Sequence, residues 1–269
     1  MGHGSFDYPA VAQLSGRLVL TVTYAEHWRQ SPVCPYVRLV IDCAVWWATP
    51  VARTDEFLPL LSPLEAERYD GYRQELDQRR FLTGRVLAKT LVAARLGIAP
   101  ETVTFDATCA DCGKHHGPPR LPDAPVRFSI SHSGERVGIA LTEDTPVGLD
   151  VEAANRRAED SLIDYALSET ERRTVHALPE DERADAFFTY WARKEAVLKA
   201  TSKGLRLPLR SITLTPPSEL AGLLSSTDDS LTPESTRLAD LTPGPGYRAA
   251  VALLTEQEIA VTEHHWSPA

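Results

Sequence analysis

The chain has 269 residues, a formal net charge of −9, and 43% hydrophobic and 24% charged residues, which is ordinary for a folded globular protein. The negative charge disfavours general binding to nucleic acid, so any polyanionic ligand has to meet a local basic cluster. No stretch approaches the roughly 20 apolar residues that span a bilayer, and the first residues lack a signal-peptide pattern, so we expect a cytoplasmic protein without membrane attachment.

The first part of the chain predicts an extension followed by strands and helices. Residues 1–35 have no sustained periodicity and are expected to be an N-terminal extension. Ser62, followed by Pro63 and Glu65, has the pattern of a helix start in which the serine caps the first turn. The elements expected up to residue 125 are a strand at 37–47, a helix from 63, a helix at 76–96 and a strand at 102–105.

The second part of the chain predicts further strands around one long helix. A helix over 168–176 precedes a longer one, in which Phe187, Trp191 and Leu198 form a narrow apolar stripe. Residues 215–246 are rich in Pro, Ser, Thr and Asp and are expected to be mostly surface loop. The strands expected here are 126–131, 137–141, 146–152, 207–214, 247–254 and 259–266.

Two stretches of the chain share one order of features. Residues 79–105 and 189–214 each contain a helix studded with basic residues, a Gly–Leu pair in either order, a proline and a strand. The likeness predicts an α+β fold of two similar α/β subdomains, a pseudo-dimer with the active site between them, although coincidence is the alternative for units this short. We expect the halves at 36–145 and 146–269.

The long helix carries charges that its packing does not explain. Glu195 and Lys199 are one helical turn apart and face the same way. Lys194 falls within the apolar stripe, and Glu195 lies at its edge. A carboxylate that is half-sunk against a packed face is costly unless a cation compensates it. We therefore expect a cation near Glu195.

Two more carboxylates share one face of a predicted strand. Asp150 and Glu152 are two residues apart, so they repel each other unless a cation or a proton lies between them. Oxygen ligands suit Mg²⁺, which takes one or two carboxylates, waters and substrate phosphates. A solvated strand face is the alternative, because this spacing is common there.

Basic residues and hydroxyls suggest where phosphate binds. Ser131 and His132 follow a strand; no nucleophile elbow surrounds them, so phosphate binding or turn capping is favoured over a Ser–His nucleophile. Arg80 lies where a bidentate phosphate contact is plausible, whereas a solvated helix face is the alternative for its basic neighbours. Those neighbours are Arg79, Arg85 and Lys89.

A cysteine and histidine cluster precedes that strand. Cys109, Cys112, His115 and His116 offer four ligands that can hold a structural zinc ion. The spacing is tighter than the usual zinc pattern, and no second cysteine pair follows. A Gly/Pro-rich loop with incidental Cys and His is the alternative.

Three segments, taken in order, resemble motifs of the 4′-phosphopantetheinyl transferases of the Sfp-like, surfactin-synthetase-activating type. Residues 128–134 (FSISHSG) resemble the family's F-S-x-S-H-S-G segment, and residues 146–152 (PVGLDVE) resemble its G-[IVL]-D-[IVL]-E metal motif. Residues 187–205 (FFTYWARKEAVLKATSKGL) resemble its W-x-x-K-E-A/S-x-x-K-x-x-G-x-G-L motif, without the first glycine. Three motifs in this order are specific, whereas any one alone is weak.

The resemblance implies transfer of 4′-phosphopantetheine from coenzyme A to a serine hydroxyl of an apo acyl or peptidyl carrier protein, with release of 3′,5′-ADP. It implies Mg²⁺ held by Asp150, Glu152 and Glu195. Glu195, or a metal-bound water, is then the candidate base, and Lys199 contacts the transferring phosphate. The residues that it implies for coenzyme binding are Arg80, Ser131, His132, Lys194 and Lys199, with Glu171 a looser match to an acid near the metal.

The chain departs from the family's Gly-Lys-Pro segment, which here contains Gly117 and Pro118 without the lysine, so Arg120 is the expected substitute. Because carrier proteins are typically acidic, we expect docking on a local basic surface, to which Arg206 and Arg210 contribute unless they are simply solvated. Two similar halves in one chain favour a monomer. The rivals are another Mg²⁺-dependent phosphate-handling enzyme and a non-catalytic zinc-binding protein.

Overall fold

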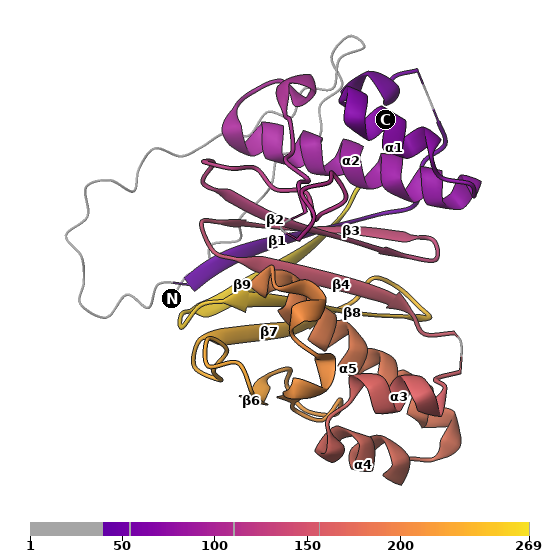
Figure 1. Cartoon of the computed structure of the whole chain (residues 1–269), viewed down its shortest axis with the longest axis vertical. Helices are drawn as coiled ribbons and strands as arrows, with labels where there is room; N and C mark the ends of the chain where they lie inside the picture. Colours follow the sequence, from indigo (N-terminus) through magenta and orange to yellow (C-terminus); the bar gives the residue numbers. More distant parts are fainter. Residues whose placement is uncertain (1–39, 54, 110, 156, 269) are drawn as a thin grey trace, which may run out of the picture.

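The computed structural model describes residues 40–268, with the exception of 54, 110 and 156, and shows four layers (Figure 1). One long helix covers one sheet, a second sheet packs beneath the first, and another long helix covers its far side. The expected extension at 1–35 lies outside the described residues. The elements are β1 (Val40–Ala48), α1 (Pro63–Asp70), α2 (Glu75–Leu96), β2 (Val126–Ser133), β3 (Arg136–Glu143), β4 (Val147–Ala153), α3 (Asp160–Ala166), α4 (Glu169–Ala177), α5 (Glu180–Thr201), β5 (Ile212–Leu214), β6 (Leu223–Ser226), β7 (Thr236–Leu241), β8 (Tyr247–Leu254) and β9 (Glu258–His265), with short 3-10 turns η1 (Leu58–Leu60), η2 (Pro100–Thr102), η3 (Gly204–Arg206) and η4 (Leu209–Ser211).

Each half repeats one arrangement, which confirms the predicted pseudo-dimer. The first half runs β1, α2 and the β2–β3 hairpin, and β3 returns to pair antiparallel with β1. The second half runs β4, α5 and the β7–β8 hairpin, and β8 returns to pair antiparallel with β4. Both long helices have 22 residues. The chain therefore has an α+β fold of two similar subdomains.

Local signals set the helix ends where the sequence predicts them. The Ser62 side chain accepts a hydrogen bond from the Glu65 backbone, and the Glu65 side chain accepts one from the Ser62 backbone, so α1 begins with a capping box. Gly97 ends α2 with a φ of 68°, a left-handed conformation that glycine adopts without a steric penalty.

Several expected strands differ in the structure. The strand expected at 102–105 is η2 followed by an isolated bridge between Asp106 and Arg120. The strand expected at 207–214 is only β5, because η4 occupies the residues before it. Two strands, β6 and β7, lie within the predicted loop at 215–246, because their partners are supplied by β5 and β8.

The last strand crosses back to the first half. β9 pairs in parallel with β1 and completes a sheet of order β2-β3-β1-β9, whereas the second sheet has the order β4-β8-β7. The β9 segment, which falls in the range 146–269 expected for the second half, thus pairs with the sheet of the first half. Trp47 fixes this crossing, because its indole nitrogen donates to Glu263 of β9 at 2.7 Å.

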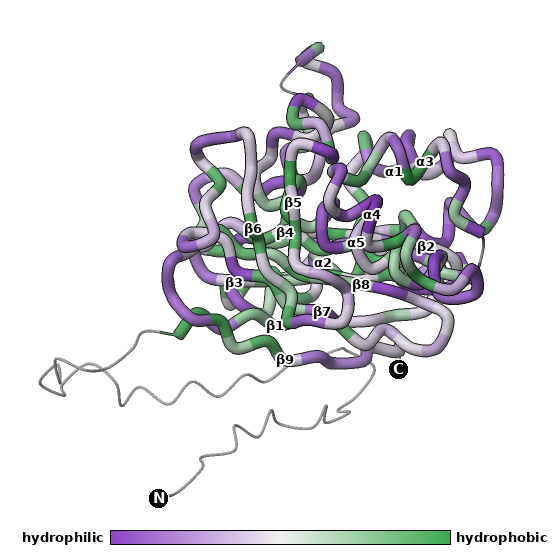
Figure 2. Tube along the Cα trace, turned by 90° about the horizontal axis from the view of Figure 1, so that it is seen from below, coloured by the Kyte–Doolittle hydropathy of each residue, from purple (hydrophilic) through white to green (hydrophobic). Residues whose placement is uncertain are grey.

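Apolar residues fill three layers between the helices and the sheets. Figure 2 shows the hydrophobic segments along the central strands and the hydrophilic segments mostly at the periphery. Between the sheets, Trp47 of β1 packs with Leu149 of β4 and Val251 of β8. A cluster around Phe187 and Val197 lies between α5 and the second sheet, and smaller clusters join α2 to the first sheet. Both faces of each sheet are thus covered along most of their length.

The two halves meet along β2 and β4 through serine side chains. The hydroxyls of Ser129, Ser131 and Ser133 accept hydrogen bonds from the β4 backbone at 2.9, 3.2 and 3.1 Å. The donors are the backbone N–H groups of Leu149, Val151 and Ala153. A buried backbone N–H without a partner costs about 1–3 kcal/mol, so this serine seam satisfies an edge strand that no backbone ladder covers on that side.

The closest approach of helix and strand yields a stability prediction. A Cβ on Gly148 would collide with the backbone of Ala196 and Ala200 in α5, and backbone atoms cannot move aside without separating β4 from the helix. We expect Gly148→Ala to lower the free energy of unfolding by roughly 1–3 kcal/mol or more, measured by urea denaturation. Gly222→Ala is the matched control, because its nearest atom would be the Thr215 Cγ2 at an ordinary 3.4 Å. Equal stability of the two variants would contradict the packing described.

Candidate active site

A large cleft of about 1550 Å³ lies between the two halves. The start of α2, the end of β2 and the loop between η2 and β2 form one side, and β4 with the last turns of α5 forms the other. The predicted site residues that line it are Arg80, Ser131, His132, Asp150, Glu195 and Lys199. A cleft therefore lies between the halves, where the sequence predicts the active site.

Asp150 is the most buried carboxylate on the cleft floor. It is 4% exposed, and its Oδ1 accepts hydrogen bonds from Lys199 Nζ at 2.7 Å and from Ser131 Oγ at 3.0 Å. Its other oxygen, Oδ2, is buried and has no hydrogen-bond partner in the described part of the chain. A buried carboxylate oxygen without a partner is costly, and a cation is the partner that would satisfy it.

Glu152 and Glu195 complete a set of three carboxylates. Ser133 Oγ donates to Glu152 at 3.2 Å. Burial raises the pKa of the Glu195 carboxyl, and the neighbouring charges of Asp150 and Glu152 raise it further, against an opposing effect of Lys199. Oxygen donors of this number and charge fit a divalent cation such as Mg²⁺, so the chemistry of the donor set agrees with the unpartnered Asp150 Oδ2.

The three carboxylates lie near one another, but their oxygen atoms do not converge on one point. Among the described residues, the only group whose ligand atoms all lie within 4.8 Å of one another is Cys109, Cys112 and His116. The ammonium of Lys199 holds Asp150, and three negative charges repel each other when no other cation is between them.

Lys199 uses all its donors on the protein. Its three N–H groups are matched by three acceptors, which are Asp150 Oδ1 at 2.7 Å, the Leu149 carbonyl at 3.0 Å and Ser131 Oγ at 3.0 Å. Its side chain is 32% exposed at the cleft. Contact with a phosphate group therefore requires that one of these bonds is exchanged.

Ser131 is bonded within the protein. Its single proton is donated to Asp150, and its oxygen accepts from Val151 N and Lys199 Nζ. It therefore positions Asp150 and Lys199. Its contact with the coenzyme stays a prediction and requires that one of these bonds is exchanged.

Arg80 and His132 lie together at the other wall of the cleft. Arg80 donates through Nε to the Gly134 carbonyl at 2.8 Å and through Nη1 to Asp77 at 2.9 Å, which joins α2 to the β2–β3 turn. Desolvation lowers the pKa of the His132 imidazole, and the cations Arg80 and Lys199 lower it further. His132 is therefore neutral at physiological pH and presents one N–H donor and one acceptor.

Lys194 does not line the cleft in this structure. Its ammonium is wholly buried and forms an ion pair with Glu171 at 2.7 Å, with further hydrogen bonds to the carbonyls of Leu209 and Ile212. Glu171 is equally buried, and its Oε1 accepts from the backbone of Leu214. This pair joins α4 and α5 to the β5 segment, and the expected roles of both residues in coenzyme or metal binding stay predictions.

The basic residues of α2 divide into two roles. Arg85 and Lys89 are 6% and 1% exposed and share the carboxylate of Glu65, at 3.2 and 2.7 Å. Burial lowers the pKa of Arg85 to about 10, although Glu65 opposes the shift. They are not a solvated face, because α1 packs a carboxylate against them. Arg79 instead donates to the Pro50 and Val51 carbonyls.

The sequence interpretation missed the serine seam itself. Ser129 and Ser133 alternate with Ser131 along β2, so all three point to β4. Hydroxyls at three alternating positions of one strand were the available signal. Their role depends on which strand lies beside β2, which local patterns do not specify.

The cysteines have distinct surroundings. Cys43 is in the core, where burial raises its thiol pKa to about 12, and Cys34 lies outside the described residues. Cys109, Cys112 and His116 gather on the loop between η2 and β2, whereas His115 is not part of that group. None of the described helices is both long and apolar enough to cross a membrane.

Comparison with known proteins identifies the family. A model described as the 4′-phosphopantetheinyl transferase superfamily matches residues 146–252, and a model of the N-terminal part of 4′-phosphopantetheinyl transferases matches residues 46–144. The Sfp 4′-phosphopantetheinyl transferase of Bacillus subtilis is 29% identical over 60% of this chain and 68% of its own length. HetI of Nostoc is 28% identical over 69% of this chain and 80% of its own length. The chain belongs to the 4′-phosphopantetheinyl transferases of the Sfp type and is an enzyme of that class.

Proposed function

We propose that this transferase moves 4′-phosphopantetheine from coenzyme A to a serine hydroxyl of an apo acyl or peptidyl carrier protein, and that 3′,5′-ADP leaves. The observation that carries the proposal is the cleft floor between the halves. There, buried Asp150 bonds to Lys199 through one oxygen and leaves its other oxygen without a hydrogen bond, next to Glu195. Such a site suits a substrate that brings phosphates and a divalent cation.

Asp150, Glu152 and Glu195 are the residues that would hold Mg²⁺. The bound ion would neutralise charge on the diphosphate of the substrate. Asp150 and Glu195 line the cleft, and Glu152 adds its negative charge beside Glu195. Ser131 and Ser133 keep Asp150 and Glu152 oriented through their hydroxyls.

The remaining residues handle charge and protons. Glu195, with its raised pKa, is the side chain best suited to accept the proton of the attacking serine hydroxyl. Lys199 supplies a positive charge beside the transferring phosphate after it exchanges one of its protein acceptors. Neutral His132 and the guanidinium of Arg80 supply N–H donors for coenzyme phosphates at the far wall.

The carrier protein would approach the open side of the cleft. Arg206 of η3 is exposed there and pairs with Asp111, so an acidic partner has to compete with that carboxylate for the guanidinium. Arg210 is also exposed. We infer a monomer, because one chain supplies both halves of the cleft. We also infer that it acts in the cytoplasm. The boundary between residues 145 and 146 is likewise proposed as the junction of the halves.

Glu195 gives a stability prediction with a defined sign. Because its pKa in the folded state is above its ordinary value of 4.5, the folded state binds this proton more tightly, and stability falls as pH rises through that window. In metal-free buffer, Glu195→Gln should therefore melt at a higher temperature than wild type at neutral pH, and the difference should vanish below about pH 4.5.

Glu234→Gln, at an exposed position, is the control. It should leave the melting temperature unchanged both at neutral and at acidic pH. Added Mg²⁺ should stabilise wild type more than Glu195→Gln, because the variant lacks one carboxylate of the proposed set. A Gln variant that is less stable than wild type at neutral pH in chelator contradicts the assignment.

The transfer itself is tested by the mass of the carrier. With coenzyme A, Mg²⁺ and an apo carrier, wild-type enzyme should add one phosphopantetheinyl group and release 3′,5′-ADP. Asp150→Asn should lower the rate by roughly 100-fold or more, because it removes charge that acts in the transition state. Exposed Asp229→Asn should be neutral.

Two results would count against the proposal. Folded wild-type enzyme that leaves a panel of apo acyl and peptidyl carriers unmodified contradicts the assigned reaction. Stoichiometric cleavage of coenzyme A without any carrier would instead favour a hydrolase, the runner-up function.

A further inference from the structure

We propose that the loop between η2 and β2 holds a zinc ion through Cys109, Cys112 and His116, at a site separate from the three carboxylates. The ligand atoms of these residues all lie within 4.8 Å of one another, and Cys112 Sγ is 2.9 Å from His116 Nε2. Tetrahedral zinc with bonds of about 2.0–2.3 Å places its ligands roughly 3.4–3.8 Å apart. The Cys112–His116 pair, at 2.9 Å, has to open slightly to reach that spacing, and the remaining ligand atoms already lie within 4.8 Å of it.

The donor set selects the metal. Two thiolates and one imidazole are soft to intermediate ligands, which suit zinc, whereas Mg²⁺ takes oxygen ligands. The described carboxylates at the cleft floor offer oxygen alone. The chain therefore presents two sites of different chemistry. Zinc prefers the thiolates and the imidazole, and Mg²⁺ prefers the carboxylates.

Backbone hydrogen bonds help to bring these ligands together. Cys109 N donates to the Lys114 carbonyl at 2.7 Å, and Gly113 N donates to the Cys109 carbonyl at 2.9 Å. Gly113 has a φ of 71°, so it turns the chain back and returns Cys112 and His116 over Cys109. The site is thus preorganised before an ion arrives.

The base of the loop is closed by main-chain bonds. Asp106 and Arg120 exchange two backbone hydrogen bonds at 2.9 and 2.8 Å, and Gly117 N donates to the Ala107 carbonyl at 2.8 Å. The residues of the loop tip are exposed, so hydrophobic burial contributes little to holding it. A bound metal is a common way to fix so small a unit.

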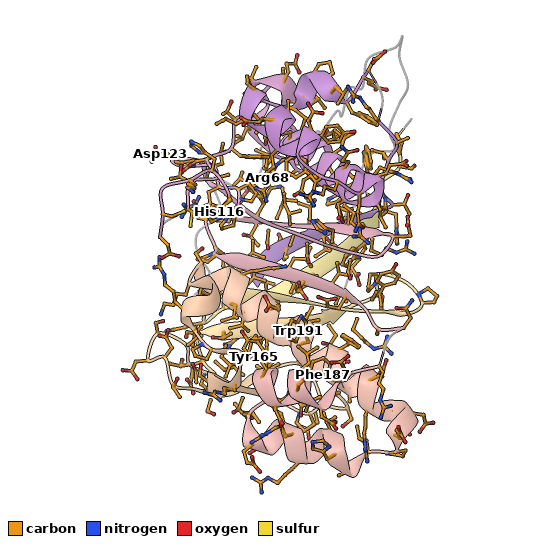
Figure 3. The ribbon with its side chains drawn as sticks, turned by 45° about the vertical axis from the view of Figure 1, so that its right-hand side comes forward. Arg68, His116, Asp123, Tyr165, Phe187 and Trp191 are labelled. Atoms are coloured by element: carbon orange, nitrogen blue, oxygen red, sulfur yellow. The ribbon has the colours of Figure 1, made fainter. Side chains whose placement is uncertain are left out.

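The loop forms one wall of the cleft, which gives the ion a structural consequence. Figure 3 shows His116 and Asp123 at the same edge of the first half, and both line the cleft. Asp111, next to the ligand Cys112, pairs with Arg206 of the second half. Zinc would therefore fix a segment that connects the two halves beside the substrate.

His115 and His116 supply a matched pair of variants. They are adjacent and exposed, yet only His116 belongs to the group of close ligand atoms. With three protein ligands, the fourth position is left to solvent. His115→Ala should then keep the ion, and His116→Ala should lose it.

The experiment measures zinc in untagged protein purified without chelator. We expect one zinc ion per wild-type chain, the same content in His115→Ala and in Asp150→Asn, and loss in Cys112→Ser and His116→Ala. Retention in Asp150→Asn separates this site from the carboxylate site, so its outcome is independent of the proposed reaction. Co²⁺ added to the metal-free wild-type protein should give a thiolate charge-transfer band that Cys112→Ser lacks.

A second readout tests the structural consequence. Trypsin should cleave the metal-free wild type and Cys112→Ser after exposed Lys114 faster than the zinc-loaded protein, because the ion fixes the loop. Wild-type zinc no higher than that of Cys112→Ser would overturn the site. Loss of zinc in Asp150→Asn with retention in Cys112→Ser would overturn it too, as would a Cys109–Cys112 disulfide in place of the metal.

Discussion

The structure depends on three serine hydroxyls of β2 that accept hydrogen bonds from the backbone of β4. Each strand is the edge of its own sheet, and the serine seam replaces the backbone ladder that would otherwise join them. Side-chain oxygens hold the strands farther apart than a ladder would. Because the hydroxyls also have protons to donate, Ser131 and Ser133 reach Asp150 and Glu152, so the contact that joins the halves also orients the carboxylates.

The cleft floor concentrates charge at a cost to stability. Asp150 is nearly buried, the pKa of Glu195 is raised by burial, and Lys199 is held by three protein acceptors. Burial of these groups costs stability, and the Asp150 Oδ2 has no hydrogen-bond partner among the described residues. The Lys194–Glu171 pair is wholly buried and lies away from the cleft. One helix thus carries a lysine buried in an ion pair and a lysine at the cleft, five residues apart.

The sequence predicted the elements whose signals are local. The capping box at Ser62, the glycine stop at Gly97 and the shared face of Asp150 and Glu152 all follow from neighbouring residues. The ion pair of Lys194 with Glu171 could not be predicted, because α5 is buried nearly all round and periodicity cannot say which face meets the cleft. β7 was expected as loop because its surroundings are rich in Pro, Ser, Thr and Asp. The strand at β9 was predicted, but its pairing with β1, like the bonding of Ser131 to β4, depends on residues far along the chain.

The most direct test of this account is the divalent affinity of the metal-free protein, measured by electron paramagnetic resonance with Mn²⁺. Ser131→Ala removes the hydroxyl that orients Asp150, whereas Ser129→Ala removes a seam bond without touching a carboxylate. We predict that Ser131→Ala binds Mn²⁺ roughly tenfold more weakly or worse, as loss of a group behind a metal ligand generally does. Ser129→Ala should bind it like wild type. Unchanged affinity in folded Ser131→Ala would contradict the central claim that the serine seam builds the metal site.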